Sequence, residues 1–421
     1  MDIEQFRKAG YQAIDRICDY YYSLEKRPVS SQVQPGYLRE ALPPNAPEAG
    51  EVFEKIADDY QQLIIPGIGG GVIQTTASDA ALVSIVAARS VFVKQHPHIK
   101  HEDLVIYTTT ETHSLGQKAG LILGVRCRAL KVTVEDNFAL RGSTLLTALE
   151  EDSKRGKHPF IIVATVGTTS SGAIDRLDEI GQVVKSHGSI WLHVDAAWAG
   201  VALACPELRD TVQLDSINTY ADSFCTNFHK WGLVNFDASA LWVRNRKNLT
   251  DALDITPEFL RSKHGDEGTV IDYRNWHLGL GRRFRSLKVW FVLRSYGQEG
   301  FRKHIRQGIA LNKYFVSLLR PPFTLITEPS FALSVFRLEP PSLPAEQASQ
   351  VSKKSLDDLN RDFYSRVSAC PDILITQTLI NGMFCLRFAV GAVRTEKRHI
   401  DQAWALLQSH AEVSINSWIG S

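Results

Sequence analysis

One lysine, Lys230, stands in a run of aromatic and apolar residues that reads ADSFCTNFHKWGLVNF. Removing an ammonium group from water disfavours its charged form, so a lysine in such surroundings becomes a nucleophile more readily. A surface lysine whose aliphatic stem covers apolar neighbours gives the same local pattern. The run by itself leaves both a catalytic and a surface lysine open, and other residues must decide between them.

An aspartate upstream, Asp195, closes the apolar run WLHVD and is followed by small residues in DAAWAG. Small residues at that point let a flat ring approach the backbone. If Lys230 carries pyridoxal phosphate (PLP) as an imine, the ring nitrogen needs a carboxylate that keeps it protonated, so that the ring accepts electrons from the substrate α-carbon. Taken alone, Asp195 could instead cap the next helix. Its combination with Lys230 favours the cofactor interpretation.

A third segment, GGGVIQTTASDAALVSIVAARS, places three glycines before a cluster of hydroxyl residues and a helical pattern. Helix N-termini attract phosphate because free amides and the positive end of the helix dipole point at the anion. The hydroxyls of Thr76 and Ser78 add further donors. A glycine-rich turn alone is weak evidence, and the absence of GxGxxG spacing after a strand excludes a dinucleotide fingerprint. Together, the three segments predict a PLP site.

The elements that must position these residues fall into three zones. Residues 1–67 predict a helical arm, because Phe6, Ile14, Ile17 and Tyr21 recur at helical spacing before a proline-rich connector. In residues 68–288, apolar runs such as DLVIYT, PFIIVAT and IWLHVD alternate with helical stretches, which indicates a mostly parallel sheet covered by helices. Residues 289–421 combine helices with the runs FALSVFRL and MFCLRFAV, which predict a smaller α+β domain.

The composition is that of a soluble globular protein whose partner is a small molecule. Lysine and arginine number 47 against 46 acidic residues, without long runs of either sign, so no footprint for nucleic acid or an anionic membrane is visible. The six cysteines form no CxxC pair, and no histidine pair has metal-site spacing, so neither a disulfide framework nor a metal is expected. Neither a signal sequence nor a membrane-spanning stretch is recognisable, which predicts a cytoplasmic location.

Taken together, these segments resemble the PLP-dependent aromatic-L-amino-acid decarboxylases, the group II decarboxylases, which include the aromatic acetaldehyde synthases. Further matching stretches are ETHSLGQKAG, VATVGTTSSGAID, DYRNWHLGLGRRFRSLKVWFVLRSYG and FCLRFAVG. The resemblance implies the α/β aspartate-aminotransferase fold (fold type I) and PLP as the cofactor. It also implies decarboxylation of an aromatic L-amino acid of the tryptophan, tyrosine, phenylalanine or DOPA type to an arylalkylamine and CO2, by a homodimer with the site at the subunit interface.

The resemblance further implies a role for each site residue. Lys230 holds the cofactor, Asp195 pairs with its ring nitrogen and His113 stacks on one ring face. Ala197 covers the opposite face, and Thr168 lies near the ring oxygen. The residues that line the phosphate end, with His229 beside them, are Thr76, Ala77, Ser78 and Asn227.

The sequence departs from the decarboxylases in a loop that reads DITPEFLRSKHGDEG. In the decarboxylases a loop tyrosine protonates the α-carbon after CO2 has left, and Phe259 occupies its position here. Phenylalanine has no proton to give. The acetaldehyde synthases carry phenylalanine at this position and let oxygen intercept the carbanion, which yields aldehyde, ammonia and peroxide. Two outcomes stay open, namely this one and an amine formed with His113 or water as the acid.

A second departure is that QQLIIPG runs directly into IGGGVIQ, whereas relatives insert several dozen residues that help to form the substrate pocket. The junction lies between Gly67 and Gly69. Three interpretations follow: a truncated gene model or splice form, an enzyme with a reshaped pocket, and an inactive homologue that pairs with an intact relative. An aminotransferase stays a further alternative on fold grounds.

Two residues bear on the substrate pocket. Gly281, in GLGRRFR, matches a position where glycine leaves room for an indole and serine favours phenolic substrates. Trp198 stands where relatives usually have tyrosine, and its larger ring would narrow the pocket. The substrate is therefore predicted only as an aromatic L-amino acid.

Overall fold

The computed structural model describes residues 2–23, 26, 33, 36–64, 73–255, 273–340 and 355–419. Contacts within the chain group it into two compact units. The first comprises Met1–Val72, Ile255–Asn275 and Gly279–Phe301, and the second comprises Ile73–Asp254, Trp276–Leu278 and Arg302–Ser421. The predicted division at residues 67 and 288 stays a prediction.

The first unit is helical in its described part. Its elements are α1 (Ile3–Tyr22), α2 (Tyr37–Ala41), α3 (Phe53–Asp59), a π-helical turn (Tyr60–Ile64) and the beginning of α12 (Arg285–Leu318). The helix predicted in the N-terminal arm is thus present, and a capping box between Asp2 and Gln5 starts it. Arg294 of α12 is buried and forms ion pairs with Glu51 and, at 2.7 Å, with Asp59. These ion pairs attach α12 to the segment from Glu51 to Asp59, which contains α3.

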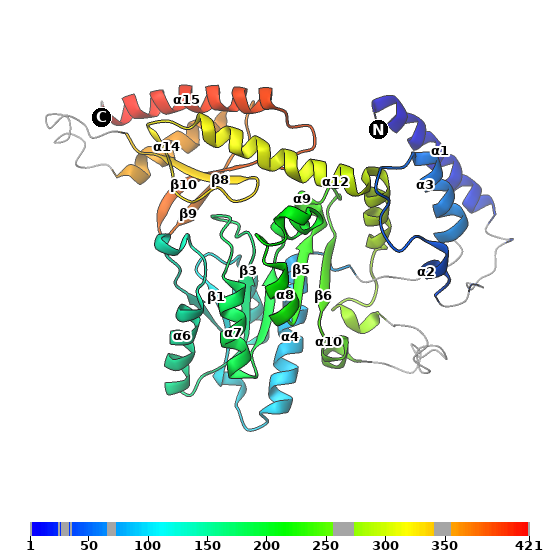
Figure 1. Ribbon diagram of the computed structural model, residues 1–421, viewed down its shortest axis with the longest axis horizontal. Helices are drawn as coiled ribbons and strands as arrows, with labels where there is room; N and C mark the ends of the chain where they lie inside the picture. Colours follow the sequence, from blue (N-terminus) through cyan, green and yellow to red (C-terminus); the bar gives the residue numbers. More distant parts are fainter. Residues whose placement is uncertain are drawn as a thin grey trace. The chain divides into compact units, whose positions relative to one another are not determined.

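The second unit contains a six-stranded sheet in the order β2-β1-β3-β4-β5-β6 (Figure 1). Its strands are β1 (Leu104–Thr109), β2 (Arg126–Leu130), β3 (His158–Thr165), β4 (Trp191–Asp195), β5 (Ser223–Asn227) and β6 (Ser239–Val243). All neighbours from β2 to β5 are parallel, and β6 runs antiparallel to β5. β1, β4 and β5 are buried along their whole length, as expected of parallel strands covered on both faces.

Helices connect the strands and cover the sheet. They are α4 (Ala77–Gln95), α5 (Leu115–Leu123), α6 (Gly142–Lys154), α7 (Leu177–His187), α8 (Leu214–Tyr220), α9 (Phe228–Trp231) and α10 (Arg246–Leu253). α4 is rich in alanine and packs against β3 to β6 as well as against α5 and α10. This helix lies close to the sheet because its small side chains are buried, namely Ala80, Ala81, Ala87 and Ala88. Its packing against the sheet holds its N-terminus in a fixed direction.

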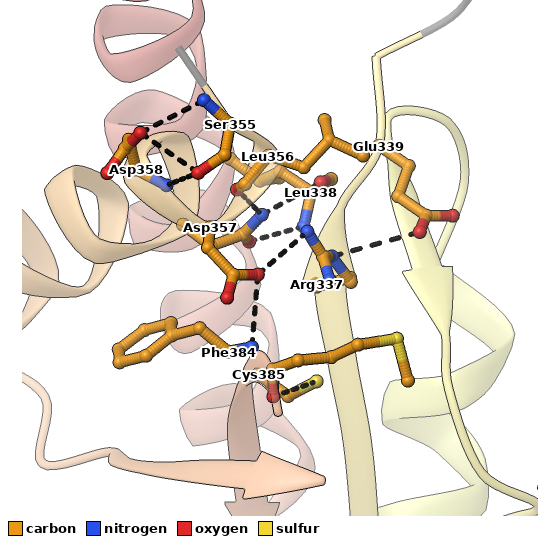
Figure 2. Close-up of polar contacts among 11 residues, drawn as sticks. Arg337, Leu338, Glu339, Ser355, Leu356, Asp357, Asp358, Phe384 and Cys385 are labelled. Carbon is orange, nitrogen blue, oxygen red and sulfur yellow. Dashed lines mark hydrogen bonds and ion pairs between the residues drawn. The ribbon is translucent and has the colours of Figure 1, made fainter. Parts of the chain in front are cut away.

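A second, four-stranded antiparallel sheet has the order β7-β8-β10-β9. It consists of β7 (Phe323–Leu325), β8 (Leu333–Leu338), β9 (Thr376–Ile380) and β10 (Met383–Ala389), with helices α14 (Leu356–Ala369) and α15 (Lys397–Ile419). Figure 2 shows how α14 is attached: buried Arg337 of β8 pairs with Asp357 at 3.3 Å, and Asp357 accepts a hydrogen bond from the Phe384 amide at 3.1 Å. The α/β architecture with a smaller α+β part, predicted from FALSVFRL and MFCLRFAV, is confirmed.

Candidate active site

A cavity lies where the chain leaves the carboxyl ends of the parallel strands β1, β3, β4 and β5, the edge at which open α/β sheets bind ligands. Each strand contributes side chains from the turn that follows it, and the start of α4 closes one side. The lining residues are Thr76, Ala77, Ser78, His113, Leu115, Thr165, Gly167, Thr169, Asp195, Ala197, Trp198, Asn227, His229, Lys230 and Phe236.

Asp195 is the last residue of β4, and its side chain is buried. The backbone N–H of Ala197 donates a hydrogen bond of 2.9 Å to its Oδ1, so the carboxylate is held by the turn that it begins. The alternative that Asp195 caps a helix through N2 or N3 of a long helix does not apply, since only a short 3-10 helix (Ala199–Ala204) follows. The carboxylate lines the cavity, as predicted for a partner of the ring nitrogen.

Lys230 lies on α9, the single helical turn that follows β5. Its side chain lines the cavity but is exposed, whereas its neighbour Trp231 is fully buried. Of the aromatic neighbours of Lys230 in the sequence, Trp231 packs into the core, whereas Phe236 is exposed and lines the same cavity as Lys230. The run alone left a catalytic and a surface lysine open, and in the structure Lys230 and Asp195 line the same cavity, as the cofactor interpretation requires.

His113 follows β1 in a turn that is tied down at two points. Thr109 and Thr112 bond one another through their hydroxyls at 2.9 Å, and buried Glu111 accepts a hydrogen bond from the Ser170 hydroxyl in the turn after β3. Desolvation lowers the pKa of the His113 imidazole, against the opposing effect of the Asp195 carboxylate. The ring is therefore neutral near pH 7, and a neutral imidazole suits stacking on a flat heterocycle.

The predicted phosphate end lies at the N-terminus of α4. Thr76 is the N-cap, and its hydroxyl accepts from the Asp79 amide at 3.3 Å, while Ala77 and Ser78 form the first turn, whose amides are free to bind an anion. Across the cavity, Asn227 has a buried side-chain oxygen without a hydrogen-bond partner among the described residues. The amides of this helix turn are donors that an anion would complete, whereas the Asn227 oxygen is an acceptor and adds no donor to them.

His229 lies beside this end with a defined tautomer. Its Nδ1 accepts a hydrogen bond of 2.8 Å from the Ala238 amide, so the proton of the neutral ring resides on Nε2. The ring also contacts Phe236 edge-on, with 4.7 Å between the centroids. His229 is thus fixed as an Nε2–H donor at the cavity wall.

The two threonines of the VGTT segment have different surroundings. Thr169 lines the cavity, whereas Thr168 is buried and its hydroxyl bonds to Ser171 at 2.7 Å and to the Ala173 amide at 2.9 Å. The turn reverses at Gly167, where φ is +81°. The hydroxyl of Thr168 closes its own turn and Thr169 lines the cavity, so the role of Thr168 near the cofactor stays a prediction.

Trp198 lines the cavity and is part of an aromatic stack. Its ring lies parallel to that of Trp231, with 5.3 Å between the centroids, and Phe331 contacts it edge-on. A Cβ on Gly167 would come within 3.1 Å of the Trp198 ring, so glycine is needed there for the indole to fit. Trp198 therefore forms a wall of the cavity that its aromatic neighbours hold in place, and its narrowing of the substrate pocket stays a prediction.

Three sequence predictions fall elsewhere. Phe259 and the junction between Gly67 and Gly69 lie outside the described residues. Gly281 is exposed in the first unit, and a Cβ added to it would meet nothing within 4 Å. Its role in substrate selection stays a prediction. The cavity-lining residues that the sequence analysis did not predict are Leu115, Thr165, Gly167, Thr169 and Phe236. Thr165 and Gly167 lie within three residues of the end of the predicted strand PFIIVAT, and Phe236 lies six residues after Lys230.

Comparison with known proteins decides the family. The model of the pyridoxal-dependent decarboxylase conserved domain matches residues 67–339, more than half of the chain. The chain belongs to the pyridoxal-dependent decarboxylase family. Tryptophan decarboxylase 2 of Oryza sativa subsp. japonica is 39% identical over 485 aligned positions, with 98% of this chain and 95% of the relative covered. Phenylacetaldehyde synthase of Arabidopsis thaliana is 37% identical, with 98% and 96% covered.

The fold of this decarboxylase agrees with solved members of the family. The structure of Catharanthus roseus tryptophan decarboxylase in complex with L-tryptophan superimposes with a TM-score of 0.74 at 31% identity, with 98% of this chain and 99% of that chain covered. The predicted fold type I is therefore confirmed. The alignment with the rice relative has more positions than this chain has residues, so it contains gaps in this chain, and their place between Gly67 and Gly69 stays a prediction.

Pyridoxal phosphate is the cofactor of this decarboxylase, and the cavity suits it. The cavity offers an amine at Lys230, a carboxylate at Asp195 and a helix N-terminus at Thr76, groups that could receive the aldehyde, ring nitrogen and phosphate of the cofactor. Among the described residues, no cluster of three or more His, Cys, Asp or Glu side chains is arranged to hold a metal ion. No helix in the same part of the chain is long and apolar enough to span a membrane, and the cytoplasmic location stays a prediction.

Proposed function

We propose that this decarboxylase acts on an aromatic L-amino acid and releases CO2 and an arylalkylamine. The observation that carries the proposal is the single cavity in which Lys230, Asp195 and His113 lie together beside the N-terminus of α4. The aromatic side chains of Trp198 and Phe236 line the same cavity, which favours a flat substrate side chain. The names of the relatives, tryptophan decarboxylase and phenylacetaldehyde synthase, support the same substrate class.

Each residue of the cavity has its own role. The cofactor, when bound, supplies the electron sink for the electron pair left on the α-carbon. Lys230 holds the cofactor and gives way to the substrate amine. Asp195 keeps the ring nitrogen protonated, His113 orients the ring from one face, and Ser78 with the amides of α4 fixes the phosphate.

The test is a product assay on the PLP-saturated protein with L-tryptophan, L-tyrosine, L-phenylalanine and L-DOPA, using D-tryptophan as the control. We expect CO2 release from at least one L-substrate, with an aromatic product detected by mass spectrometry, and none from D-tryptophan. Transfer of the amino group to a keto acid without CO2 release would indicate an aminotransferase instead. Failure of the folded protein to bind PLP would exclude any catalytic function of this cavity.

A second candidate function is that of an aromatic acetaldehyde synthase. The observation that favours it is Phe259, which has no proton to deliver to the α-carbon. Both routes begin with the same loss of CO2, so they differ only in what happens at the α-carbon. The product therefore separates them, whereas CO2 release does not.

We also propose that the chain forms a homodimer in which α1 packs on a second copy. The stripe Ile3, Phe6, Ile14, Ile17 and Tyr21 repeats at helical spacing along α1, and each of these side chains is more than half exposed in the single chain. Isolated exposed apolar residues are common, but a continuous helical stripe marks a surface that another protein covers. An identical chain is the occupant that the family resemblance favours.

The double substitution Ile14→Ser and Ile17→Ser tests this interface. We expect the dissociation constant of the dimer to rise at least roughly 100-fold, since each buried aliphatic side chain contributes about 1.5 kcal/mol and each substitution is present in both protomers. Sedimentation velocity across a concentration series measures it. Leu374→Ser is the matched control, because this leucine is 97% exposed in the loop before β9 and lies far along the chain from α1. A wild-type chain that stays monomeric when loaded with PLP would contradict the proposal.

A further inference from the structure

A chain of buried polar side chains leads from the interior of the sheet to the cavity. It begins at Trp191 and passes through Ser223, His193 and Cys225 to Asp195. The successive distances are 2.8 Å from Trp191 Nε1 to Ser223 Oγ, 2.7 Å to His193 Nδ1, then 3.7 Å from His193 Nε2 to Cys225 Sγ and 3.8 Å to Asp195 Oδ1. All five side chains are buried, and only Asp195 also lines the cavity.

The sheet register explains why these side chains meet. On β4 the residues 191, 193 and 195 alternate with apolar ones, so they share one face of the strand. The neighbouring strand β5 places Ser223 opposite His193 and Cys225 opposite Asp195. A buried polar group without a hydrogen-bond partner is costly, so each donor along this row must face an acceptor.

The residues at the two ends of the row determine in which direction its hydrogen bonds are donated. The indole N–H of Trp191 can only donate, and the ionised carboxylate of Asp195 can only accept. If Ser223 accepts from Trp191 and donates to His193 Nδ1, the imidazole carries its proton on Nε2 and donates to the Cys225 sulfur. The thiol then donates to Asp195 Oδ1. The opposite tautomer would direct the thiol proton to His193 and leave Asp195 without it.

The neutral forms that this arrangement needs are the stable ones. Burial lowers the pKa of His193 to about 4, so the imidazole is uncharged above that pH. Burial and the nearby Asp195 carboxylate raise the pKa of the Cys225 thiol well above its ordinary value. Near neutral pH, His193 and Cys225 are therefore both uncharged, and every donor of the row is oriented toward Asp195.

We propose that Cys225 is a positioning residue whose thiol, oriented by His193 and Ser223, holds Oδ1 of Asp195 and leaves Oδ2 to the ring nitrogen of the cofactor. No proton is transferred along the row. Each donor polarises the next, and the ordered dipoles stabilise the carboxylate charge at the point where the pyridinium must be kept protonated. Ser223, His193 and Cys225 thus act on the cofactor only through Asp195, since none of the three lines the cavity.

The first test compares three substitutions at one position in the holoenzyme. Cys225→Ala removes the donor, Cys225→Val removes it while filling the space, and Cys225→Ser keeps it. We expect the PLP dissociation constant, measured by absorbance titration, to rise about 5-fold in the alanine and valine variants and to stay within about 2-fold of wild type in the serine variant. Cys385→Ala is the control, because Cys385 is an equally buried thiol in the four-stranded sheet.

The second readout is the tautomer of His193, which cofactor affinity does not report. In protein labelled with 15N-histidine, the resonances lost in His193→Gln identify this ring. We expect Nε2 to be protonated and Nδ1 to be an acceptor in wild type, and the Nε2 signal to move in Cys225→Ala. A proton on Nδ1 would overturn the proposal, as would equal cofactor affinities in all three Cys225 variants, which would assign position 225 to packing alone.

Discussion

Lys230→Ala is expected to lower turnover at least roughly 1,000-fold and to abolish the visible absorbance of the covalently held cofactor. A catalytic lysine that forms the covalent link cannot be replaced by a neighbour, since no other lysine lines the cavity among the described residues. Loss of the amine also removes the group that gives way to the substrate. The effect is therefore expected on both binding and turnover, which absorbance spectra and single-turnover kinetics would separate.

Borohydride treatment makes this result specific. Reduction fixes the cofactor to wild-type protein, and mass spectrometry of the digest should place the added mass on the peptide that contains Lys230. Lys185→Ala, at an exposed position on α7, is the control and should keep both the absorbance and the turnover. Cofactor that is still fixed by borohydride in the Lys230→Ala protein would show that another amine holds it.

Phe259→Tyr is expected to change the product, with the ratio of amine to aldehyde rising at least roughly 10-fold. A positioned acid accelerates proton transfer by about 100-fold or more, and the tyrosine hydroxyl supplies a proton that phenylalanine lacks. If Phe259 governs the outcome, as the second candidate function requires, wild-type protein should consume oxygen and release aldehyde and peroxide in step with CO2. An oxygen electrode and chromatography of the products measure the two routes in one reaction.

Phe259→Leu is the matched control, because it removes the aromatic ring without adding a hydroxyl, and it should keep the wild-type product ratio. Amine formation without oxygen uptake in wild type, together with an unchanged ratio in Phe259→Tyr, would rule out the aldehyde route. If cofactor is bound but neither product forms, the missing pocket segment becomes the explanation. A relative's segment grafted between Gly67 and Gly69 should then restore turnover.

Much of the site could be predicted from the sequence because its residues sit at strand ends. Asp195 and Lys230 follow runs whose composition marks them as buried strands, and the carboxyl ends of parallel strands meet at one edge. The N-terminus of α4 was predictable for a similar reason, since Thr76 precedes a long helical pattern. These predictions needed only the order of elements and the direction of the strands.

Side-chain directions within the turns could not be predicted in the same way. Whether Thr168 or Thr169 points into the cavity depends on the positive φ of Gly167 and on the hydrogen bonds of Ser171, neither of which has a periodic signal. The sequence left the exposure of Lys230 open, because its run mixes residues that face the core, such as Trp231, with residues that face the cavity, such as Phe236. The alternation of polar residues in WLHVD was visible, but the partner Cys225 came from the strand register.

The cavity also has a consequence for how the chain folds. Its walls come from turns after β1, β3, β4 and β5, and from α4 before them, so residues from Thr76 to Phe236 must all be in place before it exists. Parallel pairing of this kind closes long loops and is slow compared with the formation of local helices. A partly folded chain therefore has no PLP site. Excess PLP binds only the completed sheet, and by mass action it draws the population of folding molecules toward the native state.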